Sequence, residues 1–198
     1  MVGKEMVKAL RERTGAGVLD CKRALEKTGG DLEEATRVLR QKGLAIAARK
    51  VGRVAQEGLV EAYIHAGGRL GALVEINCET DFVARTEEFQ RLAHDLAMQV
   101  VASNPQYLCP EDIPPEVIEE KKRLFLTELE GQDKPEHLME RIVEGKLEGY
   151  YDQVCLLRQP FIKDEGLTVA EVITEGIAKL GENIVVRRFV RYELGERS

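Results

Sequence analysis

Tryptophan is absent from this chain of 198 residues, and histidine, cysteine and proline are scarce. The four cysteines are widely and irregularly spaced and form no CxxC pair, so the close ligand pairs of a structural zinc site are missing. We expect four reduced thiols and no metal centre. The thiols belong to Cys21, Cys78, Cys109 and Cys155.

Long apolar runs are also missing. No stretch approaches the roughly 18 apolar residues that a membrane helix needs, and residues 1–5 contain no apolar signal core. Hydrophobic residues make up 43% of the chain and charged residues 32%, a balance typical of globular proteins in water. We therefore predict a cytoplasmic protein that makes no membrane contact.

The motifs by which proteins hold nucleotides are lacking as well. There is no GxxxxGK[ST] run, and the closest approach to a dinucleotide motif is Gly15-Ala16-Gly17 followed by Asp20. This segment lies between two predicted helices rather than after a strand, so a phosphate would lack its usual strand–loop–helix frame. We expect no bound cofactor.

Catalytic constellations are equally hard to find, because none of the three histidines lies in a recognisable nucleophile or metal motif. A thiol–imidazole pair of Cys78 and His94 can be drawn, which keeps a thiol enzyme as an alternative. However, His94 falls on the polar side of a predicted surface helix. The sequence favours a protein that is not an enzyme.

The charge balance argues against nucleic acid as a partner. The formal net charge is −6 and the sequence pI is about 5.3, whereas proteins that bind nucleic acid usually present a basic surface. A short basic stripe, Arg187, Arg188 and Arg191, lies in a predicted strand. Such a stripe is more often a solvated strand face than an RNA site.

The first part of the chain predicts three short helices. Apolar residues recur at helical spacing up to about residue 43, and Asp31 followed by Glu34 has the spacing of a capping box. Gly43 is expected to end the third helix, and residues 44–57 are expected to form a helical or partly flexible connector. We therefore predict a helical bundle and connector over residues 1–54 and a second domain over residues 55–198.

The second part predicts an α+β domain. A hairpin is expected at residues 59–78 around the turn Ala66-Gly67-Gly68, and β-branched and aromatic residues predict a last strand at 184–192. Between them, we expect helices over residues 87–103, with Thr86 as N-cap, over much of residues 110–152, and from Thr168 to Gly181. The hairpin and the last strand would form one sheet.

The segment between the hairpin and the next helix, residues 77–83, leaves two interpretations open. Phe82 and Val83 are expected in a loop. Phe82 either folds back as a lid on the core, with Asp81 in a turn beside Thr80, or is an apolar anchor for a partner's pocket, a role in which aromatic residues are frequent. Pattern alone favours the lid.

Three long motifs in the same order resemble bacterial elongation factor Ts across nearly the whole chain. They are residues 10–25 (LRERTGAGVLDCKRAL), residues 75–85 (EINCETDFVAR) and residues 181–188 (GENIVVRR), with Gln159-Pro160-Phe161 as a shorter match. The resemblance implies a ubiquitin-associated-like N-terminal bundle of three helices, followed by an antiparallel three-stranded sheet packed with helices. It also implies a guanine-nucleotide exchange factor that promotes GDP release from elongation factor Tu.

The resemblance further assigns roles to residues. Thr80, Asp81, Phe82 and Val83 would contact the GTP-binding domain of elongation factor Tu, where Asp81 and Phe82 would press between two helices and disturb the magnesium and phosphate site. Three bundle residues would contact another helix of the partner: Leu10, Val18 and Leu19. Bundle core is the alternative for all three, evenly balanced for Leu10 and less favoured for the other two.

The chain departs from the longer members of the family, because it has one hairpin-plus-helix unit where they have two core modules. A two-fold homodimer would supply the second module and give a two-plus-two complex. Val190 and Tyr192 in the last strand are the candidate interface residues, although this strand could simply complete the sheet. The alternative function is a helical-bundle adaptor that binds another protein partner.

Overall fold

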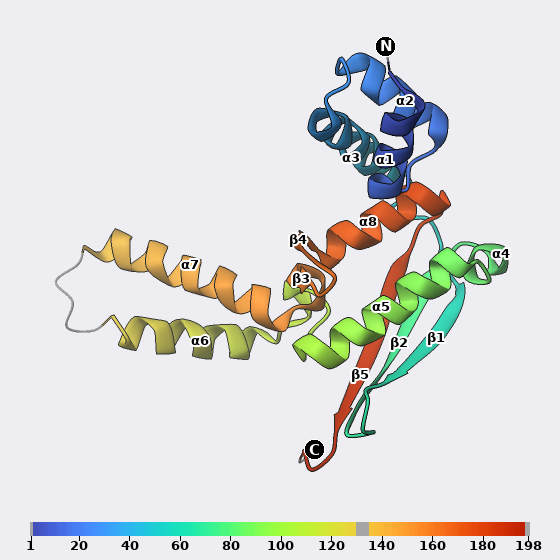
Figure 1. Ribbon diagram of the computed structural model, residues 1–198. Helices are drawn as coiled ribbons and strands as arrows, with labels where there is room; N and C mark the ends of the chain where they lie inside the picture. The colour runs from blue at the N-terminus through green and yellow to red at the C-terminus, as the bar shows by residue number, and fades with distance from the viewer. Residues whose placement is uncertain (1, 130–134, 197–198) are drawn as a thin grey trace. The chain divides into compact units, whose positions relative to one another are not determined.

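The computed structural model describes residues 2–129 and 135–196 and has the predicted α+β fold (Figure 1). The chain forms two compact units. The first comprises residues 1–59, 76–92 and 173–185, and the second comprises residues 60–75, 93–172 and 186–198. The predicted domain boundary between residues 54 and 55 stays a prediction.

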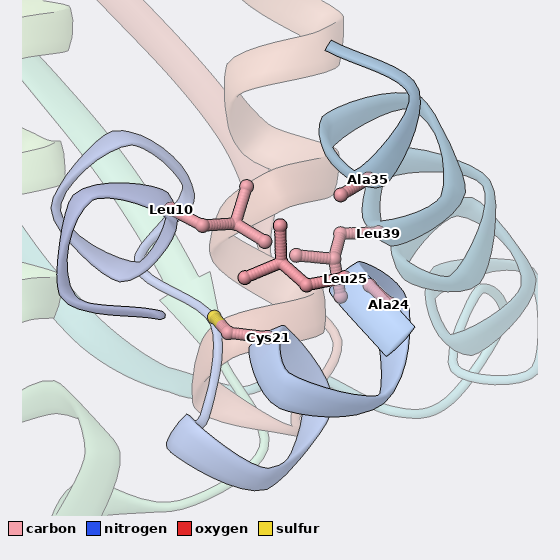
Figure 2. Packing of buried hydrophobic residues seen from close by; sticks show 6 residues of the cluster. All are labelled: Leu10, Cys21, Ala24, Leu25, Ala35 and Leu39. Carbon is pink, nitrogen blue, oxygen red and sulfur yellow. The ribbon is translucent and has the colours of Figure 1, made fainter. Parts of the chain in front are cut away.

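Three N-terminal helices in the first unit pack around a small apolar core. They are α1 (Lys4–Thr14), α2 (Val18–Lys27) and α3 (Leu32–Ala48). Burial of a leucine side chain stabilises a fold by about 2 kcal/mol relative to exposure, so this cluster holds the helices together. Figure 2 shows its members: Leu10, Cys21, Ala24, Leu25, Ala35 and Leu39.

Local signals set the ends of these helices. Gly15 has a φ of 65°, the left-handed conformation that follows many helices, and its N–H donates to Arg11 O. Asp31 accepts a 3.0 Å hydrogen bond from Glu34 N at the start of α3, as the capping spacing predicts. In a full capping box, Asp31 N would donate to the side chain of Glu34. Here Asp31 N donates to Thr28 O instead.

The prediction that Gly43 ends the third helix is wrong, since α3 continues to Ala48. A glycine inside a helix costs about 1 kcal/mol relative to alanine, so it weakens a helix without ending it. The position has a packing role: a Cβ placed on Gly43 would lie 3.3 Å from Ala178 Cβ of α8. The glycine therefore allows close approach of the two helices.

The predicted three-stranded antiparallel sheet is confirmed. Its strands are β1 (Glu57–Ile64), β2 (Leu70–Cys78) and β5 (Val185–Glu193), in the order β1-β2-β5. The turn of the hairpin contains Gly67 and Gly68, with φ of 92° and 68°, where a side chain would be strained. The last strand therefore joins the sheet beside β2, although it is distant in sequence.

Two of the helices between β2 and β5 begin at the predicted caps. Thr86 Oγ1 accepts from Phe89 N at 3.3 Å at the start of α5 (Glu87–Ser103). Thr168 and Glu171 form a reciprocal capping box at α8 (Val169–Leu180), because each side chain accepts from the other's backbone N–H. Gly181, with a φ of 76°, then ends α8.

The second unit also contains a helical hairpin, in which α6 (Pro115–Thr127) and α7 (Glu136–Val154) run side by side (Figure 1). A small two-stranded sheet that the sequence analysis missed pairs β3 (Pro160–Phe161) with β4 (Asp164–Thr168).

No helix in the described ranges combines the length and apolarity needed to cross a membrane.

Candidate protein-binding site

The segment after β2 is a single helical turn rather than the predicted loop. This turn, α4 (Asp81–Ala84), begins directly after Thr80, whose Oγ1 accepts a 3.4 Å hydrogen bond from Val83 N. Only two residues separate it from the end of β2. A helix this short has no apolar periodicity, so pattern reasoning had no signal for it.

The turn points one apolar side chain into solvent and two into the protein. Phe82 is 77% exposed, whereas its neighbours Val83 and Ala84 are buried. Asp81 forms an ion pair with Arg85 at 2.8 Å along the exposed side of the turn. The structure therefore excludes the interpretation of Phe82 as a lid on the core and leaves its ring accessible to a partner.

The backbone before the turn is held by Glu182, which follows α8. Its carboxylate accepts hydrogen bonds from Glu79 N at 3.1 Å, from Thr80 N at 3.0 Å and from Thr80 Oγ1 at 2.7 Å. Sequence reasoning noted this residue only within a motif and gave it no role. The three donors lie about 100 positions earlier in the chain, so no local signal could have paired them.

The carboxylate of Glu79 makes the reverse contact, with the backbone of the residue after Glu182. Glu79 Oε1 accepts from Asn183 N at 2.7 Å, and Glu79 Oε2 lies 3.4 Å from Arg53 Nη1. The hydrogen bond from Asn183 and the neighbouring Arg53 guanidinium lower the pKa of Glu79 below its ordinary value of 4.5. Asn183 Nδ2 also donates to Arg53 O at 2.9 Å.

The thiol beside the turn is not prepared for nucleophilic chemistry. Cys78 is buried, and its Sγ donates to Thr80 O at 3.1 Å. Burial raises the pKa of this thiol, which favours the unreactive protonated form. His94 has its own partners: Nδ1 lies 3.0 Å from Glu61 Oε1, and the ring meets Tyr63 edge-on at 5.4 Å. These contacts argue against the thiol-enzyme alternative.

The three bundle candidates divide into core and surface. Leu10 is fully buried in the bundle, which favours the core alternative for this residue. Val18 and Leu19 occupy the first turn of α2, after Gly17, and both are exposed. The structure therefore makes only the last two directly available to a partner.

The outer face of the sheet in the second unit carries the remaining candidates. Arg191 is turned toward α5, where its Nε donates to Val101 O at 3.3 Å, and the alternation of a strand then places Val190 and Tyr192 on the opposite face. Both are exposed. Arg188, from the basic stripe, pairs with Glu75 at 2.7 Å on β2, so part of the stripe is neutralised.

Within the described residues, no group of three or more His, Cys, Asp or Glu side chains could hold a metal ion. The four cysteines are free. Burial raises the pKa of Cys155 to about 11, and burial with neighbouring carboxylates raises that of Cys109 to about 12. Val18, Leu19 and Phe82 are among the exposed apolar side chains of the first unit, which also include Leu44, Val51 and Val54.

Comparison with known proteins agrees with the motifs. Residues 4–196 match the family described as Elongation factor TS. Over 196 residues, 99% of the chain, it is 59% identical to Elongation factor Ts of Carboxydothermus hydrogenoformans, 58% identical to that of Moorella thermoacetica and 55% identical to that of Caldanaerobacter subterraneus subsp. tengcongensis. The matched segments cover 90%, 97% and 98% of those relatives, which confirms the resemblance to the short form. The chain therefore belongs to the elongation factor Ts family, and it is a nucleotide-exchange factor for elongation factor Tu rather than an enzyme.

Proposed function

We propose that Phe82 is the residue through which this protein promotes GDP release, by inserting its ring into an apolar pocket on the GTP-binding domain of elongation factor Tu. The observation that carries the proposal is the 77% exposure of this ring on a turn whose other apolar side chains are buried. Thr80, Asp81 and Val83 are the other residues assigned to this contact. Thr80 and Val83 shape the turn, and Asp81 adds charge beside the ring.

The energetics of exchange explain why the protein needs no catalytic group. An exchange factor must bind the nucleotide-free partner more tightly than the GDP-bound partner. By linkage, the factor then weakens GDP binding by the same ratio that GDP weakens binding of the factor. Burial of a phenylalanine ring contributes about 1.5–3 kcal/mol, or roughly ten- to a hundredfold in an equilibrium. Phe82 promotes exchange if its pocket is open only in the nucleotide-free partner.

The N-terminal bundle would add a second contact on the same partner. Val18 and Leu19 are exposed at the start of α2 and offer two adjacent apolar side chains. Leu10 would act indirectly, because it fills the core on which α2 packs. A contact made equally well with and without GDP raises affinity without changing the exchange ratio, so the bundle would hold the factor in place while Phe82 acts.

A second copy of the chain would complete the working assembly. The sheet face that carries Val190 and Tyr192 also exposes Val60, Ile64 and Leu73, and an apolar patch of this kind is typical of an interface. Two chains would then bind two molecules of elongation factor Tu. The place of action is the cytoplasm, where elongation takes place.

The test follows fluorescent GDP leaving elongation factor Tu in stopped flow. Phe82→Ala should reduce the stimulated release rate roughly tenfold or more, because the ring's burial energy is lost. Ile162→Ala, which truncates a partly exposed apolar residue in the second unit, serves as the matched control and should act like the wild type. Undiminished stimulation by a folded Phe82→Ala variant would refute the insertion mechanism and assign GDP release to other residues of the protein.

A further inference from the structure

The turn that carries Phe82 is too short to be stable by itself. A four-residue helix makes very few internal hydrogen bonds, and isolated helices shorter than about 12 residues are marginal in water. Buried Val83 and Ala84 attach one side of the turn to the protein. The orientation of its N-terminal end therefore depends on contacts of the β2–α4 junction, residues 79–80. Two carboxylates make these contacts, that of Glu182 and that of Glu79 in the junction itself.

The contacts of Glu182 act on the start of the turn through one hydroxyl group. Thr80 Oγ1 donates its hydrogen to Glu182 at 2.7 Å and accepts from Val83 N at 3.4 Å. Because a hydroxyl has a single hydrogen, its donation to the carboxylate leaves the lone pairs free for the amide of α4. Glu182 thus orients the group that caps the Phe82 turn, and it also accepts the backbone N–H groups of Glu79 and Thr80.

Glu79 closes the connection from the other side. Its carboxylate accepts from Asn183 N, the residue after Glu182, so each of the two glutamates binds backbone next to the other. Hydrogen bonds to an ionised carboxylate are stronger and shorter than neutral ones. Arg53, from the connector after α3, joins through its guanidinium and through its carbonyl, which accepts from Asn183 Nδ2.

We propose that Glu182 and Glu79 are positioning residues for nucleotide exchange, and that their reciprocal clamp on the β2–α4 junction fixes Phe82 in the orientation that enters the partner. The inference rests on the proposed function of Phe82. It extends that function to two acidic residues that need not touch elongation factor Tu. Arg53, which lies in the connector after the helical bundle, contacts the same group of residues through Glu79 and Asn183.

The decisive measurement separates the maximal rate of GDP release from the concentration of factor that gives half that rate. Glu182→Ala should lower the maximal rate roughly three- to tenfold, because a loosely held turn spends less time in the productive orientation. The half-saturating concentration should change less, since the contacts of Val18 and Leu19 remain. A purely structural role predicts the reverse: a smaller folded fraction, with the full rate recovered at saturation.

Three further variants sharpen the test. Glu182→Gln keeps one acceptor oxygen and should recover part of the rate, and Thr80→Val, which removes only the hydroxyl, should lower it even if Glu182→Ala folds poorly. Glu165→Ala removes an exposed glutamate of β4 and should match the wild type. Circular dichroism confirms folding of each variant.

A double variant identifies which proposal fails, if one does. Once Phe82 is alanine, its orientation no longer matters, so Phe82→Ala with Glu182→Ala should be no slower than Phe82→Ala alone. If Phe82→Ala is slow but Glu182→Ala and Thr80→Val reach the wild-type maximal rate, the clamp is overturned and the role of Phe82 stands. If Phe82→Ala itself retains the full rate, the proposed function has failed and the clamp fails with it.

Discussion

The exposure of Phe82 is a consequence of its neighbours. In a single helical turn, consecutive side chains point in directions about 100° apart, so burial of Val83 and Ala84 directs the preceding ring outward. Exposing a phenylalanine loses the stabilisation that its burial would supply, which a protein tolerates where the ring has a partner outside the chain. The orientation is therefore specified by local packing and by the carboxylates at the junction.

Sequence reasoning found the Phe82 segment but not its conformation. Pattern alone favoured a lid on the core, because an aromatic residue beside an apolar strand is usually buried. The turn itself is too short to produce a helical period, and the stabilising Glu182 lies about 100 residues away. Leu10 shows the same limit, because core and contact residues of a small bundle have the same apolar character.

The ionised state of Glu79 predicts a pH dependence of stability. Its pKa is lowered in the folded protein by the hydrogen bond from Asn183 N and by Arg53, so the ionised form is favoured by folding. This contribution is present above the ordinary pKa of 4.5 and is lost as the pH falls through the lower folded value. Glu79→Gln should therefore lower the melting temperature at pH 7, with a difference that shrinks below pH 4.5.

Thermal melting across a pH series checks this expectation. Glu165→Gln, an exposed substitution on β4, provides the matched control and should leave the melting curve unchanged at each pH. A difference between Glu79→Gln and wild type that stays constant from pH 7 to pH 3 would show that the carboxylate's charge contributes nothing.

At the scale of elements, capping signals located helix starts better than glycine located a helix end. Thr86, Thr168 and Asp31 each accept the backbone hydrogen bond that their spacing predicts. These signals are local, so the sequence contains them in full. Gly43 misled because a glycine can mark either the end of a helix or a close approach, and only the packing of α8 distinguishes them. The short β3–β4 pair gave no usable pattern.

The close approach at Gly43 predicts a destabilising substitution. A leucine there would meet Ala178, which lies 3.3 Å from the first added carbon, and overpacking of this kind costs about 1–3 kcal/mol. Gly43→Leu should therefore lower the melting temperature, although leucine is the better helix former. Gly149→Leu provides the matched control, because nothing lies within 4 Å of its added Cβ in α7, and it should be neutral or stabilising by about 0.5–1 kcal/mol. Equal effects at the two positions would contradict the packing role of Gly43.

At the scale of the molecule, the outer sheet face carries apolar side chains that packing within one chain leaves exposed. Glu61 of β1 is turned toward α5 by its contact with His94, which places Val60 and Ile64 on the other face. Ile64 also lies over Gly71, where an added Cβ would come within 2.6 Å of its Cδ1. Sequence patterns identified these strands, but the shared exposed face emerges only from their pairing.

The proposed homodimer gives this face an occupant and makes a direct prediction. Light scattering at micromolar concentration should give about twice the 22.2 kDa mass of one chain. Tyr192→Asp combined with Leu73→Asp should shift the mass to that of the monomer, because two charges would be desolvated at the centre of an apolar interface. Leu126→Asp, at an exposed position of α6, should leave the dimer intact. A monomeric wild type would refute the homodimer and leave Phe82 to act from a single chain. A dimer that survives both sheet substitutions would place the interface on another surface.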